Sequence, residues 1–246
     1  MPVASSRVGL DFTDYVNPRI QNFTGRQWVF EKIHKWLSDP NSSRYFLLTG
    51  EPGSGKTAIA GQVYQRRLNQ QAIFKNSIAN FPNATHFCSA SRSTWVDPKN
   101  FSESIALQLS QIYEYAEVLL NIGEKEVNIC VQQNLGTVKD STAQGVVINN
   151  LDVSGLRSGQ EAFNRVVLDP LNTIYSNGFD KPITILVDSL DEALTFEGKK
   201  TIVDLLSAVQ DLPEQVRFLL TSRPKIEALE PLQERALVYS LTTGEG

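Results

Sequence analysis

The chain has 246 residues, of which 41% are hydrophobic, so it can bury a substantial core as one large α/β domain or two small ones. We expect one domain. A formal net charge of −4 at pH 7 gives no overall attraction for nucleic acid, whose binding proteins usually carry a basic face. Two cysteines, Cys88 and Cys130, are too few for a disulfide framework and show no C-x-x-C spacing, so we expect buried free thiols.

The N-terminal residues carry no targeting signal. They lack the basic start and the apolar core of a signal peptide, and no apolar run approaches the length needed to span a membrane. The expected location is therefore the cytoplasm. Residues 1–22 show no periodicity and contain the turn signal Asn17-Pro18, so we expect a lead-in segment.

A helix is predicted after the segment Phe23-Thr24-Gly25-Arg26, because apolar residues recur there at helical spacing up to Leu37. His34 lies in this helix with no second histidine or cysteine near it, so we expect a surface or packing role rather than metal binding. The turn formers at residues 39–43 end the helix before an apolar strand at residues 45–49.

Residues 50–57 read Gly-Glu-Pro-Gly-Ser-Gly-Lys-Thr and fit the phosphate-loop motif G-x-x-x-x-G-K-[ST] at every fixed position. The glycines allow successive backbone N–H groups to face phosphate oxygens, while Lys56 carries charge to the outer phosphates and Thr57 is placed to bind Mg²⁺. A chance match in a glycine-rich turn is the alternative, and the flanking strand and helix argue against it. The predicted nucleotide contacts in this stretch are Glu51, Pro52, Gly53, Ser54, Gly55, Lys56, Thr57 and Ala58.

The middle of the chain alternates between strand and helix patterns. Residues 84–90 read as a second strand, and Asp97-Pro98 reads as the start of a long helix, apolar from Phe101 to Leu119 in steps of three and four. A β-hairpin insertion is expected at about residues 121–160, from apolar segments at 127–131 and 145–149. Helical spacing then resumes at residues 160–179, with a kink expected at Pro170.

An apolar strand at residues 183–188 ends in Asp188, the form of a Walker B segment whose carboxylate binds Mg²⁺ directly or through water. Many ATPases place a glutamate directly after this aspartate to orient the attacking water, but Ser189 occupies that position here. The base is therefore expected to be Asp191 or Glu192, with Asp191 favoured. Alternatively, both acids only stabilise the start of the next helix.

Another apolar strand precedes Arg223, whose guanidinium is suited to contact a γ-phosphate; a solvated arginine at a turn is the alternative. A fifth strand is predicted at residues 237–241, followed by an irregular tail at 242–246.

Taken together, residues 23–26, 50–57, 183–193 and 219–224 resemble the NACHT-type group of STAND P-loop NTPases, which are NLR-like relatives of AAA+ ATPases. The acids displaced beyond Asp188 are the most specific part of the resemblance. His86-Phe87-Cys88 and the hairpin insertion resemble bacterial members. The resemblance covers about residues 22–241, and the expected nucleotide-binding domain runs over residues 23–246.

The resemblance implies a three-layer α/β sandwich around a five-stranded parallel sheet of order 5-1-4-3-2, which would bring Lys56, Asp188 and Arg223 together. It also implies ATP or ADP with Mg²⁺ as cofactors, with Gly25 and Arg26 near the base and sugar. In such proteins, exchange of ADP for ATP converts a closed monomer into an oligomer that activates an attached effector. The chain therefore resembles an excised domain of a longer protein that carries effector and sensor domains.

The favoured hypothesis is a slow regulatory ATPase acting as a signalling switch. A module that binds nucleotide and assembles without hydrolysis is the second hypothesis, and a small-molecule kinase is the third. A kinase would usually need an arginine-rich lid, whereas the hairpin region offers Lys139 and a single arginine, Arg157. A GTPase is disfavoured because no Asn-Lys-x-Asp segment occurs. Neither membrane nor direct nucleic-acid binding is expected.

Overall fold

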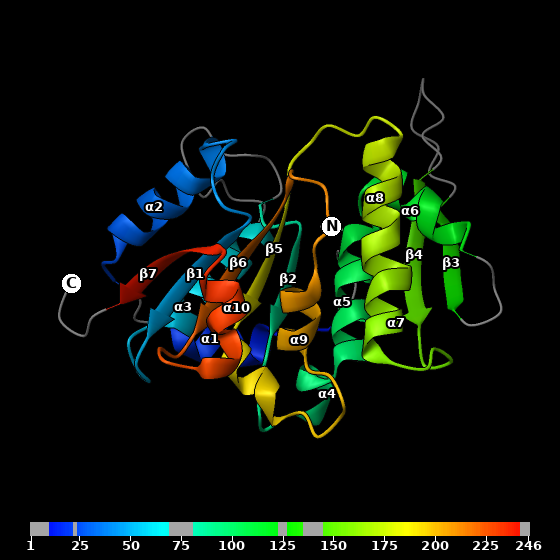
Figure 1. Ribbon diagram of the computed structural model, residues 1–246. Helices are drawn as coiled ribbons and strands as arrows, with labels where there is room; N and C mark the ends of the chain where they lie inside the picture. The colour runs from blue at the N-terminus through cyan, green and yellow to red at the C-terminus, as the bar shows by residue number, and fades with distance from the viewer. Residues whose placement is uncertain (1–9, 22–23, 69–80, 123–126, 135–144, 242–246) are drawn as a thin grey trace.

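The computed structural model describes residues 10–21, 24–68, 81–122, 127–134 and 145–241. They form a five-stranded parallel sheet flanked by helices, with strand order β2-β5-β6-β1-β7, and a separate hairpin of β3 and β4 (Figure 1). Counted along the chain within this sheet alone, the order is 5-1-4-3-2. The strands are β1 (Tyr45–Gly50), β2 (Ala84–Phe87), β3 (Asn128–Asn134), β4 (Gly145–Asp152), β5 (Ile183–Asp188), β6 (Val216–Ser222) and β7 (Ala236–Leu241).

Helices cover both faces of the sheet. They are α1 (Thr13–Ile20), α2 (Gln27–Ser38), α3 (Lys56–Leu68), α4 (Ser93–Val96), α5 (Pro98–Leu109), α6 (Tyr113–Leu120), α7 (Gly159–Phe163), a π-helical segment η1 (Asn164–Leu168), α8 (Asp169–Ser176), α9 (Ile202–Ala208) and α10 (Glu230–Gln233). Two 3₁₀ segments, η2 (Leu190–Thr195) and η3 (Glu227–Leu229), follow β5 and β6.

Successive side chains of the central strands enter two different hydrophobic cores. In β1, Tyr45 and Leu47 lie in a core shared with α5 to α10, whereas Phe46 and Leu48 lie in a core shared with α1, α2 and α3. Because side chains alternate across a strand, a sheet buried on both faces needs apolar residues at nearly every position. The result is a three-layer arrangement with β1, β5 and β6 fully buried.

The N-terminal segment is part of this fold. Residues 13–20 form α1, so the expected turn at Asn17-Pro18 is wrong, and Val16 is fully buried against α3. A Cβ added at Gly61 of α3 would lie 2.7 Å from Ile20 Cγ2, so α1 approaches α3 where this glycine leaves room. An eight-residue helix carries too few apolar positions for its periodicity to be recognised in sequence, and tertiary packing supplies its stability. Residues 1–9 and Phe23 lie outside the described residues.

The helix predicted from residue 98 onward is divided. Asp97 caps α5 as expected, accepting the Lys99 N–H at 2.7 Å. The helix then stops at Leu109, because the Ser110 hydroxyl bonds to a backbone carbonyl and Ile112 adopts an extended conformation before α6 begins. The result is two shorter helices: α5 packs on β2 and α7, α6 packs on α8, and both contact β4.

The π-helical segment η1 joins α7 to α8, and Pro170 lies in the first turn of α8. Proline lacks an N–H, so the Val166 carbonyl, four residues earlier, loses its usual helical partner. Tyr115 of α6 donates its hydroxyl to this carbonyl. This hydrogen bond thereby links α6 to η1.

The predicted hairpin is present, with β3 and β4 antiparallel and packed on α5 and α6 at the edge of the molecule (Figure 1). Its connecting residues 135–144, with Lys139, and the tail at 242–246 lie outside the described residues. Cys88 is buried as expected, but Cys130 on β3 is exposed, so the expectation of two buried thiols is wrong for Cys130. Because side chains alternate along a strand, one face of β3 points outward, and Cys130 lies on that face.

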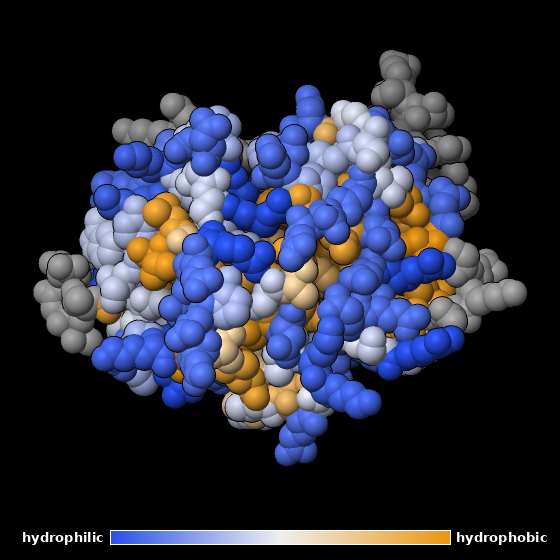
Figure 2. Space-filling model, in the orientation of Figure 1, coloured by the Kyte–Doolittle hydropathy of each residue, from blue (hydrophilic) through white to orange (hydrophobic). Residues whose placement is uncertain are grey.

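The surface facing the viewer is mostly hydrophilic, with apolar side chains in separate patches (Figure 2). Within the described ranges, no helix combines the length and apolar character that crossing a bilayer requires.

Fully buried His86 on β2 should make stability depend on pH. Its Nε2 lies 2.8 Å from the Trp95 carbonyl oxygen, and burial lowers its pKa from 6.5 to about 4. Because only the unfolded chain gains this proton between those values, the stabilisation is complete above pH 6.5 and is lost as the pH falls toward 4. From about pH 7.5 to about pH 5.5, the wild-type protein should lose roughly 1.4 kcal/mol more stability in urea unfolding than His86→Gln.

The matched control is His34→Gln, a substitution of the chain's other histidine, which lies in α2. Equal losses in the wild type and His86→Gln would contradict a buried neutral imidazole.

Candidate functional site

The loop between β1 and α3 has a backbone that requires glycine. Gly53 and Gly55 have φ angles of 81° and 96°, in the left-handed region that L side chains rarely adopt. A Cβ at Gly50 would lie 2.4 Å from Ser54 Oγ. The sequence motif therefore reflects conformations that other residues would strain.

Lys56 closes this loop from the first turn of α3. Its Nζ donates to the carbonyl oxygens of Gly50 at 2.6 Å and Glu51 at 3.2 Å. An ammonium group has three protons, so one remains for another acceptor. Burial lowers the Lys56 pKa, and the negative charges of Asp191 and Asp188 oppose that shift.

The loop fits a phosphate by its own chemistry. Ser54 Oγ is buried and has no hydrogen-bond partner among the described residues. Such a group normally finds a partner, because leaving it unsatisfied costs about 1–3 kcal/mol. A serine hydroxyl, an available ammonium proton and a helix N-terminus suit an anionic oxygen ligand.

Asp188 ends β5 with a fully buried carboxylate held on both oxygens. Thr221 Oγ1 of β6 donates to Oδ1 at 2.6 Å, and Ser189 Oγ donates to Oδ2 at 3.0 Å. The Ser189 N–H donates to Thr221 Oγ1 at 2.9 Å, in a left-handed conformation with φ 56°. Burial raises the pKa of Asp188, while hydrogen bonds from Thr221, Thr57 and Ser189 and the Lys56 charge lower it.

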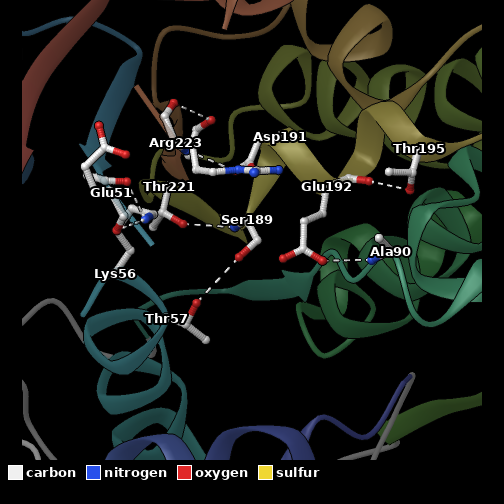
Figure 3. Close-up of polar contacts among 12 residues, drawn as sticks. Glu51, Lys56, Thr57, Ala90, Ser189, Asp191, Glu192, Thr195, Thr221 and Arg223 are labelled. Atoms are coloured by element: carbon white, nitrogen blue, oxygen red, sulfur yellow. Dashed lines mark hydrogen bonds and ion pairs between the residues drawn. The ribbon is translucent and has the colours of Figure 1, made fainter. Parts of the chain in front are cut away.

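Thr57 and Asp188, the predicted metal ligands, lie close together with Ser189 between them. Thr57 Oγ1 is 3.5 Å from Ser189 Oγ (Figure 3), and Ser189 Oγ in turn donates to Asp188. Among the described residues, no group of three or more His, Cys, Asp or Glu side chains could hold a metal. One carboxylate and one hydroxyl suit Mg²⁺, which usually keeps several of its waters.

Asp191 and Arg223 bind each other. Asp191 accepts the Arg223 backbone N–H at 3.0 Å and the guanidinium Nε at 2.5 Å (Figure 3). The Asp191 side chain is 5% exposed and that of Arg223 is 52% exposed. The hydrogen bond to Asp191 raises the pKa of Arg223. The predicted base and the predicted phosphate contact thus form an ion pair in this conformation.

Glu192 points away from this pair. Its Oε2 accepts the Ala90 N–H at 2.8 Å, and its carbonyl oxygen accepts the Thr195 hydroxyl at 2.8 Å (Figure 3). The side chain therefore ties η2 to the loop after β2. Asp191 and Glu192, adjacent in sequence, are anchored to opposite sides of β5.

Gly25 and Arg26 precede α2, both with positive φ. No hydrogen bond of the described residues links them to the phosphate loop. Sequence reasoning missed the roles of Ser189 and Thr221 as partners of Asp188. The available signal was the position of Thr221 at the carboxyl end of a predicted strand, where ligands and polar residues gather in parallel sheets.

A model of the family described as Nephrocystin 3, N-terminal, matches residues 24–146, half of the chain. The match contains the phosphate loop and the start of the hairpin but ends before Asp188 and Arg223. No curated protein matches the chain.

The unequal burial of the Asp191–Arg223 pair predicts unequal effects of removing each partner. Arg223→Ala leaves a buried carboxylate without its cation, whereas Asp191→Ala leaves an arginine that water can reach. Urea unfolding should show that Arg223→Ala is the more destabilising change, by about 1–2 kcal/mol. Equal losses, or a larger loss for Asp191→Ala, would contradict this account of the pair.

Proposed function

The chain belongs to the family described as Nephrocystin 3, N-terminal, and on that premise we propose that it binds and slowly hydrolyses ATP as a regulatory switch. Specifically, we propose a NACHT-type STAND NTPase domain that couples exchange of ADP for ATP to conformation and self-association. The observation that carries the proposal is the convergence of the phosphate loop, Asp188 and the Asp191–Arg223 pair at the carboxyl edge of a parallel sheet.

In the proposed complex, the backbone N–H groups of Gly53 and of residues 55–57 and the remaining Lys56 proton bind the phosphates. Thr57 and Asp188 would hold the magnesium ion, which supplies positive charge to the phosphate oxygens. Gly25 and Arg26 are proposed to lie near the adenine and ribose. These assignments rest on the resemblance to NACHT-type proteins and on the fit of the loop.

The Asp191–Arg223 pair suggests why turnover would be slow. We propose that Arg223 leaves Asp191 when its guanidinium contacts a γ-phosphate. Asp191 would then keep the bond to the Arg223 backbone N–H while its other oxygen becomes free to accept a proton from water. Each hydrolysis therefore begins with the rupture of a charge-assisted hydrogen bond.

A second function, nucleotide-dependent assembly without hydrolysis, is favoured by a specific observation. Both candidate bases are occupied by protein groups, Asp191 by Arg223 and Glu192 by the Ala90 N–H. In the assembly module these hydrogen bonds would persist, so neither carboxylate would reorient toward a water beside the γ-phosphate. The two functions share the binding site and differ in the chemical step.

Binding is tested by calorimetric titration with Mg²⁺ and ATP, ADP or GTP. We expect adenine-selective binding with Kd near ~100 μM, about −5.5 kcal/mol, which is lost in Lys56→Ala. Lys200→Ala provides the matched control, since Lys200 is exposed and its Nζ bonds to Gln160 Oε1. Tight GTP binding, or unchanged binding in Lys56→Ala, would overturn the proposal.

Hydrolysis is tested by measuring phosphate release under saturating Mg·ATP. If Asp191 is the base, Asp191→Ala should lower kcat by about 10²–10⁴-fold. Glu197→Ala removes an exposed carboxylate from the residues just after η2 and should leave kcat unchanged. Equal residual rates in the wild type, Asp191→Ala and Glu192→Ala would instead support the assembly module.

A further inference from the structure

Thr221 is the hydroxyl that joins β6 to the end of β5. It is 1% exposed, donates to Asp188 Oδ1 at 2.6 Å and accepts the Ser189 N–H at 2.9 Å. A backbone N–H can only donate, so the single proton of Thr221 is committed to the carboxylate. The direction of the hydrogen bond to Asp188 is therefore fixed by the backbone.

The carboxylate is held from two directions. Thr221 occupies a site on Oδ1 and Ser189 Oγ occupies a site on Oδ2, so the carboxylate plane cannot turn without losing a buried hydrogen bond. The Thr57 hydroxyl also hydrogen-bonds to this carboxylate, so one of its four acceptor positions remains for another ligand. Thr57, on the other side of Ser189, marks the direction of the proposed metal site.

The same strand end also holds the second acid. Arg223, two residues after Thr221, binds Asp191 through its backbone N–H and its guanidinium. The carboxyl end of β6 thus contacts Asp188 and Asp191 at once. Asp188 and the Asp191–Arg223 pair are therefore linked through two residues of backbone.

We propose that Thr221 is a positioning residue that orients Asp188 for the magnesium ion, so that its hydroxyl sets how much Mg²⁺ strengthens nucleotide binding. The inference rests on the proposed function, since it assumes that Asp188 holds the magnesium of a bound nucleotide. Hydrogen-bonded groups behind a metal ligand typically contribute 10–100-fold in metal affinity.

The test is calorimetric titration of the whole chain with ATP, in Mg²⁺ and in EDTA. The readout is the ratio of the Kd in EDTA to the Kd in Mg²⁺, which measures how much Mg²⁺ strengthens binding. Thr221→Val removes the hydroxyl at constant shape and should lower this ratio by about tenfold, whereas Thr221→Ser should restore it. Thr85→Val is the matched control: Thr85 on β2 is fully buried, and its hydroxyl has no partner among the described residues. A loss of general packing would lower both affinities together and leave the ratio unchanged.

An unchanged ratio in Thr221→Val would overturn the inference, and so would an equal loss in Thr221→Ser, because the hydroxyl would then not be responsible. If Thr221→Val does not fold, Thr221→Cys, whose thiol is a weak donor, replaces it with the same expected loss and the same overturning result. Failure of the wild type to bind ATP in either condition would overturn the proposed function itself. Wild-type binding without any effect of Mg²⁺ would overturn only the role of the metal.

Discussion

The buried carboxylate of Asp188 is the constraint around which the site is built. A charge removed from water is costly unless it is hydrogen-bonded, and here the compensating groups come from three places: Thr221 on β6, Ser189 after β5 and Lys56 at the start of α3. Because β6 lies between β5 and β1, Thr221 is placed between Asp188 and the loop that carries Lys56. The strand order thus supplies one of the partners of this carboxylate.

The frame that holds these strands extends to the N-terminal helix. Tyr15 of α1 packs on Phe87 at the end of β2 and on Trp95 of α4, with ring centroids 5.9 and 5.2 Å apart. Burial, assisted by the negative charge of Asp188, raises the pKa of Tyr15 to about 12. Since Val16 and Ile20 of α1 contact α3 at Gly61, this helix packs between α3 and the edge strand of the sheet.

The elements that sequence predicts well are those whose cause is local. The loop between β1 and α3 needs glycine at the positions with positive φ, and Asp97 caps the helix that immediately follows it. The buried strands are recognisable as continuous apolar runs. The pairing of Asp191 with Arg223 joins residues on different elements, so no local pattern reveals it. The same holds for Thr221 and Asp188, whose contact depends on the register of two parallel strands. Helix α1 is missed because packing, not periodicity, maintains it.

The divergence of Asp191 and Glu192 has a mechanical consequence. Strand β5 lies between β2 and β6, and η2 follows β5. In η2, Glu192 binds the loop after β2, whereas Asp191 binds Arg223 at the end of β6. A displacement of either flanking strand must therefore stretch one of these hydrogen bonds or carry η2 with it. A site built for rapid turnover would gain from acids fixed independently of the neighbouring strands. Acids held between two strands in this way would make the proposed hydrolysis depend on the relative positions of β2 and β6, which is the property that the proposed switch requires.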